Sequence, residues 1–149
     1  MAGPIGIPTD GSTRSAVVAL VAHDGKKEDL LRLARRYRST LERLRLIATS
    51  HTGSLLADDL NLPVEIMQSG PQGGDVQIGA RIVAGEVDAV VFLRDPLTAH
   101  PHEPDIQALL KICDVHTVPV ATNLASAEIL LRSFTQAIWW GREAASAPA

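Results

Sequence analysis

The chain has 149 residues, of which 46% are hydrophobic, and its formal net charge is -3 with neutral histidines. This length supports one well-packed domain, which we place at 15–141. The negative charge argues against a nucleic-acid or anionic-membrane partner, because such partners are usually met by a clustered basic face. The only cysteine is Cys113, so no intramolecular disulfide can form.

Two terminal segments fall outside this domain. Residues 1–14 are rich in glycine, proline, serine and threonine and lack the basic start and apolar core of a signal peptide, so we expect a flexible leader. Residues 142–149 are alanine-rich and are predicted to be a frayed tail. No apolar run approaches the about 20 residues that span a bilayer, so we expect a cytoplasmic protein.

The first half of the domain alternates strands and helices. A valine-rich run at 16–22 predicts a strand buried on both faces. After Lys27 a helix is expected, with apolar residues on one side and several arginines, interpreted as solvated, on the other. Further elements are predicted as a strand at 44–48, a loop at 49–54, a short helix at 55–60 and a strand at 64–67. The expected apolar side of the first helix carries Leu30, Leu33, Ala34, Tyr37 and Leu41.

The second half continues the alternation. A helix follows Asp75 and ends near Gly85, where a glycine commonly stops a helix. Strands are predicted at 87–93 and 118–121. Apolar spacing from Ile106 predicts a helix between them, and a last helix is expected at 126–140. This order predicts an α/β fold, a single domain with a five-stranded, mainly parallel sheet flanked by helices on both faces.

Polar clusters follow every predicted strand. They lie at 23–27, 49–53, 69–75, 95–105 and 122–123. In parallel sheets, ligands bind outside the carboxyl ends of the strands. The clusters are therefore expected to converge on one site.

The segment 69–75, Ser-Gly-Pro-Gln-Gly-Gly-Asp, is the strongest candidate for this site. Its glycines let the backbone approach a ligand closely, and the helix that follows presents free N–H groups that attract anions. Asp75 beside such an anion site is the first candidate for a catalytic carboxylate. An aspartate before an apolar helix also serves as an N-cap worth about 1 kcal/mol, and this alternative stays open.

Other polar residues also have two interpretations, one functional and one structural. The run Thr49, Ser50, His51, Thr52 and Gly53 could bind a phosphate through backbone N–H groups, or simply cap a helix. Lys27 could add a point charge there or be solvated. His102 could be an exposed loop residue, and Asp105 a first-turn acid. The sequence contains no Walker or dinucleotide fingerprint and no CxxC or HxxxH spacing, so we predict no metal site.

Four runs in this sequence resemble methylglyoxal synthase. The runs VAHDGKK, SGPQGGDVQIGA, FLRDPLTAHPHEPD and PVATN occur in the order and spacing of that family, over roughly 23–123. The resemblance implies conversion of dihydroxyacetone phosphate to methylglyoxal and inorganic phosphate. It also implies that no metal or organic cofactor is used, that the protein is a homohexamer and that phosphate inhibits it.

The resemblance also implies residue roles. Asp75 corresponds to the catalytic base, and His102 to the histidine that holds the carbonyl and hydroxyl oxygens. Asp105 and Asp95 are expected to orient His102 or relay protons. The remaining residues are expected to bind substrate: His23, Asp24, Lys27, Thr49, Ser50, His51, Thr52, Gly53, Ser69 and Gly70.

One segment departs from the family pattern. Where the family usually has Ala-Thr-Gly-Thr-Thr-Gly, this chain has Ala-Thr-Ser-His-Thr-Gly. Ser50 adds a side chain where backbone should approach the phosphate. His51 replaces a small hydroxyl with an imidazole, which adds favourable charge if protonated and obstructs the pocket if it points inward. We therefore expect the change to affect affinity more than reaction type.

Two other functions are compatible with parts of the sequence. The same fold serves as an effector-binding module in carbamoyl phosphate synthetase, which needs phosphate contacts but no base. A structural role would use Trp139 and Trp140 as an interface, although we prefer core or subunit packing as their explanation.

Overall fold

The structure, a computed structural model, describes residues 15–135. Its centre is a single five-stranded sheet with the order β3-β2-β1-β4-β5. All four neighbouring pairs are parallel, as predicted. The strands are β1 (Val17–Ala22), β2 (Arg45–Ala48), β3 (Val64–Ile66), β4 (Ala89–Leu93) and β5 (Val120–Ala121).

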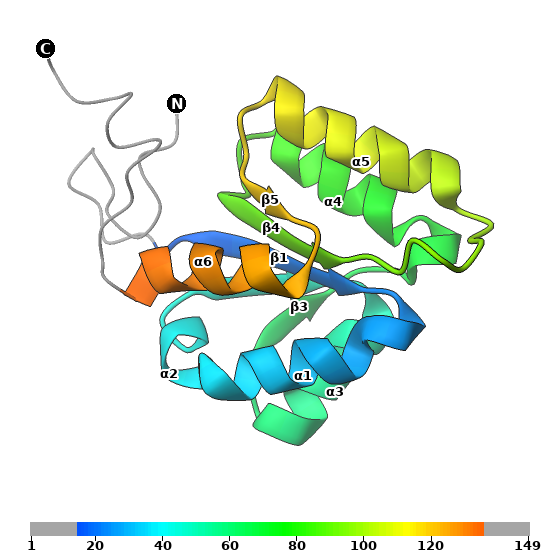
Figure 1. The fold of residues 1–149 in the computed structure, drawn as a ribbon. Coiled ribbons are helices and arrows are strands. Elements are labelled where there is room, and N and C mark those ends of the chain that lie inside the picture. The colour runs from blue at the N-terminus through cyan, green and yellow to red at the C-terminus, as the bar shows by residue number, and fades with distance from the viewer. Residues whose placement is uncertain (1–14, 136–149) are drawn as a thin grey trace, which may run out of the picture.

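Helices cover both faces of this sheet (Figure 1). Helices α1, α3 and α6 pack on one face and α4 and α5 on the other. β1 supplies both cores, because Val18 and Leu20 face the first group while Ala19 and Val21 face the second. The helices are α1 (Lys27–Arg36), α2 (Arg38–Leu41), α3 (Ser50–Leu60), α4 (Gly74–Val83), α5 (Glu103–Val115) and α6 (Leu124–Thr135).

The strand order creates one topological switch point. From β1 the chain proceeds outward through β2 to β3, and then crosses to β4 and β5 on the other side of β1. Loops leaving β1 and β4 therefore diverge to opposite faces. A crevice opens at the carboxyl ends of such strands, which is where doubly wound sheets bind ligands.

Helix boundaries differ from the predictions at three places. The helix expected after Lys27 is interrupted at Tyr37, whose φ of -107° and ψ of 24° leave the helical region between α1 and α2. α6 begins at Leu124 rather than near Ser126. The loop predicted at 49–54 is wrong, because α3 begins at Ser50.

Packing explains why α3 includes Gly53. A Cβ added at Gly53 would lie 2.8 Å from Cγ1 of Ile66, so the helix can approach β3 only with glycine there. Tertiary contact thus offsets the poor helix propensity of glycine. The predicted leader at 1–14, Trp139, Trp140 and the predicted tail at 142–149 lie outside the described residues.

Candidate active site

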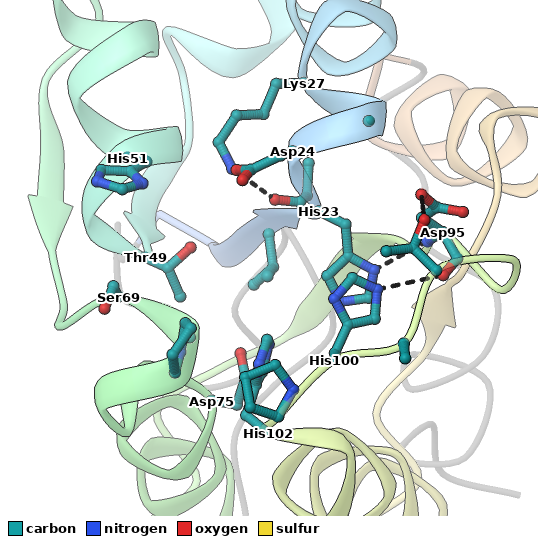
Figure 2. Close-up of a pocket in the computed structure, with 18 residues that line it drawn as sticks. His23, Asp24, Lys27, Thr49, His51, Ser69, Asp75, Asp95, His100 and His102 are labelled. Carbon is teal, nitrogen blue, oxygen red and sulfur yellow. Dashed lines mark hydrogen bonds and ion pairs between the residues drawn. The ribbon is translucent and has the colours of Figure 1, made fainter.

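A cavity of about 550 Å³ opens at the carboxyl ends of the strands (Figure 2). It brings together segments that follow β1, β2, β3 and β4. Of the 14 residues predicted for the site, Ser50, Thr52, Gly53 and Asp105 do not line it. The predicted residues that line it are His23, Asp24, Lys27, Thr49, His51, Ser69, Gly70, Asp75, Asp95 and His102.

Asp75 is the most unusual residue of the cavity. It lies in the first turn of α4, is fully buried, and neither of its carboxylate oxygens has a hydrogen-bond partner among residues 15–135. Burial raises the pKa of Asp75; nearby His102 opposes that rise and Asp105 adds to it. The N-cap of α4 is Gly73, so the alternative of a capping Asp75 is wrong.

His102 lies directly beside Asp75. Its Nε2 is 3.7 Å from Oδ2 of Asp75, and its Nδ1 is buried with no partner in the described part of the chain. His102 is the N-cap residue of α5, so the start of that helix fixes its position. The pair joins two helices that pack on the same face of the sheet.

Glycines make this close arrangement possible. A Cβ at Gly70 would lie 2.9 Å from Nε2 of His102 and 3.6 Å from Oδ2 of Asp75, inside the space that a ligand would use. A Cβ at Gly74 would lie 2.0 Å from the carbonyl oxygen of Gln68, so the turn that carries Asp75 can close only with glycine. The two glycines therefore have different functions. Gly70 keeps the space beside Asp75 and His102 open to a ligand, whereas Gly74 allows the tight backbone turn at the start of α4.

His23 follows β1 and forms another wall. Its Nδ1 accepts a hydrogen bond of 2.8 Å from the backbone N–H of Asp95, so the ring proton of the neutral imidazole is on Nε2. That Nε2 is buried and has no partner within 15–135. Burial, followed by the nearby His100, lowers the pKa of His23 to about 4. His23 is therefore a neutral N–H donor near physiological pH.

Asp95 acts through its backbone. Its carboxylate accepts hydrogen bonds from Thr98 Oγ1 (2.7 Å) and the Leu97 N–H (3.1 Å), and these bonds lower its pKa. The structure thus brings Asp95 to His23, rather than to His102 as predicted. Asp105 donates its backbone N–H to the His102 carbonyl and lies behind the cavity wall.

Lys27 and Asp24 form the polar pair at the end of β1. Lys27 Nζ donates to the Ala22 carbonyl oxygen at 3.0 Å and to Asp24 Oδ1 at 2.9 Å. The Lys27 side chain is 19% exposed and that of Asp24 is 93% exposed. The hydrogen bond from Lys27 lowers the pKa of Asp24. Lys27 is therefore fixed at the cavity, and the alternative of a merely solvated lysine is wrong.

The remaining polar wall comes from two helical N-termini. Thr49, which is buried, is the N-cap residue of α3, and Ser69 is the N-cap residue of the short 3₁₀ turn Gly70–Gln72. His51 is exposed in the first turn of α3. Figure 2 shows these three side chains and Lys27 around one end of the cavity and the Asp75–His102 pair at the other.

Sequence reasoning missed His100. Its ring stacks on that of His23, with centroids 3.7 Å apart and an angle of 24° between planes. It also lines the cavity. The available signal was the spacing of His100 and His102, which puts two imidazoles on the same short loop after β4.

Within residues 15–135, no group of three or more His, Cys, Asp or Glu side chains is placed to hold a metal ion. In the same range, no helix is long and apolar enough to cross a membrane. Cys113 is buried on the opposite side of α5 from solvent, and burial raises its pKa to about 11.

Together the fold and the cavity define an α/β protein with an acid–base site. A buried carboxylate with a raised pKa, close to imidazoles in a cleft, is characteristic of enzymes that transfer protons. The strand order places this site at the switch point between β1 and β4.

Comparisons with known proteins agree with this class. The family described as MGS-like domain matches residues 29–122. Methylglyoxal synthase of Natranaerobius thermophilus is 60% identical over 116 residues, which are 78% of this chain and 97% of that protein. Methylglyoxal synthase of Burkholderia mallei is 58% identical over 114 residues, 76% of this chain and 88% of that protein. The crystal structure of methylglyoxal synthase from Elizabethkingia anophelis superposes with a TM-score of 0.74 at 41% identity, covering 78% of this chain and 76% of that one. The chain therefore belongs to the methylglyoxal synthase family.

Proposed function

We propose that this protein is a methylglyoxal synthase, a carbon–oxygen lyase that converts dihydroxyacetone phosphate to methylglyoxal and inorganic phosphate. The observation that carries the proposal is the buried, unpartnered carboxylate of Asp75 with His102 Nε2 at 3.7 Å. An effector-binding module has no use for such a base, and the relatives at 60% and 58% identity are named as synthases.

Asp75 is the base that removes a proton from the hydroxymethyl carbon next to the ketone. This step is steeply uphill unless the developing enediolate is stabilised, so the base needs oxyanion donors nearby. His102, beside Asp75, and the Nε2–H of His23 supply hydrogen bonds to the two oxygens of the enediolate. A neutral imidazole is a suitable donor for this purpose.

Phosphate leaves from the other end of the enediolate. The negatively charged oxygen on the former hydroxymethyl carbon becomes the aldehyde C=O, the electron pair of the enediolate C=C bond forms a new C=C bond to the phosphate-bearing carbon, and the C–O bond to phosphate breaks. The resulting enol loses its hydroxyl proton and takes up a proton on its terminal CH₂ carbon, which becomes the methyl group of methylglyoxal. Lys27 binds the phosphate dianion through a charge-assisted hydrogen bond, both in the bound substrate and in the departing group.

The binding residues surround this phosphate. Thr49, Ser69 and Gly70 line the cavity near the N-termini of α3 and the 3₁₀ turn, where backbone N–H groups favour anions. His51 lies at its mouth. Ser50, Thr52 and Gly53 contribute through the first turn of α3, and Asp24 holds Lys27.

Asp95 and Asp105 support the imidazoles. Asp95 fixes the tautomer of His23 through its backbone N–H, and Asp105 lies behind His102 at the start of α5. At the level of the whole protein we propose a cytoplasmic homohexamer inhibited by phosphate, with no metal or organic cofactor.

The test is formation of methylglyoxal and release of phosphate from dihydroxyacetone phosphate by the wild type and by Asp75→Asn. We expect kcat to fall by about 10²- to 10⁴-fold in the variant, the usual contribution of a general base. Binding of dihydroxyacetone phosphate, measured by calorimetry, is expected to persist. Asp58→Asn, on the exposed face of α3, is the matched control. A wild type that binds phosphate compounds but turns nothing over would establish the effector-binding function instead.

A further inference from the structure

His23 is enclosed by aromatic rings from two other segments. His100 stacks on one face at 3.7 Å between centroids. Phe92 meets the ring edge-on at 5.2 Å, and His102 lies at 5.8 Å with an angle of 83°. His100 and His102 are 5.6 Å apart. The orientation of the His23 ring therefore depends on His100 more directly than on any other described side chain.

The backbone of Asp95 forms hydrogen bonds with both stacked rings. The N–H of Asp95 donates to Nδ1 of His23 at 2.8 Å. The carbonyl oxygen of Asp95 lies 3.3 Å from Nε2 of His100, and because a carbonyl oxygen can only accept, that nitrogen is the donor. The loop after β4 therefore holds the two rings stacked, and Figure 2 shows one over the other.

We propose that His100 is a positioning residue for the enediolate step: by stacking on His23 and sharing the Asp95 peptide, it keeps the Nε2–H of that imidazole directed at the substrate. The catalytic part of this inference, the effect of His100 on the enediolate step, rests on the proposed function. Its structural part, control of the protonation and tautomer of His23, does not depend on turnover.

Several charges face this pair. Arg94 and Asp95 come from the end of β4, Glu103 and His102 from the start of α5, and Lys26 from the 3₁₀ turn after β1. Asp95 raises the pKa of His23, whereas His100, His102 and Arg94 lower it. The first cause of its low value, however, is burial. Removal of the ring that covers His23 is therefore expected to return its pKa toward the ordinary value near 6.5.

The test compares His100→Ala with His100→Phe, which keeps a stacking ring. For His100→Ala we expect kcat/KM at pH 8 to fall about two- to tenfold, the size of one aromatic pair. At pH 6 we expect a further loss of roughly fourfold, since only about a quarter of an imidazole with an ordinary pKa is then neutral. His100→Phe should restore the wild-type pH profile. His116→Ala, on an exposed residue after α5, is the matched control.

A second readout is independent of activity. Nitrogen-15 imidazole spectra should show His23 protonated on Nε2 in the wild type down to about pH 5, and titrating at least one pH unit higher in His100→Ala. Thermal melts show whether each variant folds. A His100→Ala protein that folds and keeps both the tautomer and the pH profile of the wild type would overturn the proposal. An inactive wild type with the expected spectra would instead refute the synthase function and leave the structural role intact.

Discussion

The two ends of the cavity are built in opposite ways. At the phosphate end, formed by Lys27, Thr49, His51 and Ser69, the charged group is already paired: Lys27 bonds Asp24 and the Ala22 carbonyl. At the proton-transfer end, formed by His23, Asp75, His100 and His102, four buried polar atoms have no partner among residues 15–135. These atoms are His23 Nε2, His102 Nδ1 and both oxygens of Asp75.

This difference separates binding from chemistry. A buried polar group without a partner costs roughly 1–3 kcal/mol, so the proton-transfer end is maintained against the stability of the fold. In return, its hydrogen-bonding capacity is free for the substrate and the enediolate. The phosphate end carries less of this cost: its charged group, Lys27, is already paired, and only the buried Thr52 Oγ1 of the first turn of α3 has no hydrogen-bond partner among residues 15–135. Variants at the two ends should therefore differ in which kinetic constant they change.

At the proton-transfer end, the largest effect after that of Asp75→Asn is expected for His102→Leu. Loss of an oxyanion donor should lower kcat by about 10²- to 10³-fold, with little change in KM. Since His102 holds down the raised pKa of Asp75, the acid limb of the pH–rate profile should also move to higher pH. Steady-state kinetics between pH 5 and 9 would check both. An increase in KM at unchanged kcat would place His102 at the phosphate end instead.

The next effect is expected for Lys27→Met at the phosphate end. We expect KM for dihydroxyacetone phosphate to rise about tenfold or more, the value of one charge-assisted hydrogen bond, and kcat to change less. Lys111→Met, on the exposed side of α5, controls for net charge. If both lysine variants behave alike, long-range attraction rather than a local contact binds the phosphate.

Stability should respond in the opposite direction to activity. The pKa of Asp75 is raised in the folded protein, so ionised Asp75 destabilises the fold as the pH rises through its unfolded and then its folded pKa. Asp75→Asn should therefore be more stable than the wild type at pH 8, by on the order of 1 kcal/mol. The difference should vanish below about pH 4, where both states are protonated. Urea unfolding at the two pH values measures it, and a variant less stable at pH 8 would contradict the buried-carboxylate description.

The smallest effect is expected for His51→Thr. His51 is exposed at the mouth of the phosphate end, so loss of its N–H donor should raise KM by about two- to threefold and leave kcat unchanged. Competition by inorganic phosphate, measured in parallel, reports on the same contact. A lower KM would mean that the imidazole obstructs entry.

The local sequence was sufficient to predict the fold and to single out Asp75. The apolar run at β1 and the alternation after it predicted a parallel sheet with both faces buried. The loop before α4 predicted Asp75, because strand, glycine turn and helix follow one another within a few residues. Burial of Asp75 without hydrogen-bond partners, which supports its proposed role as base, depends on the separate start of α5 and could not be predicted from that loop.

The missed features all depend on contacts distant in sequence. His100 meets His23 only because the loop after β4 returns to the end of β1. α3 begins at Ser50 although a run of Thr, Ser and Gly favours a loop, because Gly53 packs against Ile66. Neither contact can be predicted from the periodicity of apolar residues alone.

The turn at Gly74 has a consequence for how mutational data on this protein should be interpreted. With the Gln68 carbonyl oxygen 2.0 Å from any added Cβ, every substitution at Gly74 should displace the start of α4 and with it the carboxylate. In a saturation screen scored by activity, Gly74 would rank beside Asp75 although it has no side chain to touch a substrate. Gly74 and Asp75 would then both be intolerant to substitution, the first because of the backbone turn and the second because of its carboxylate. Only a binding or folding assay would distinguish the two causes.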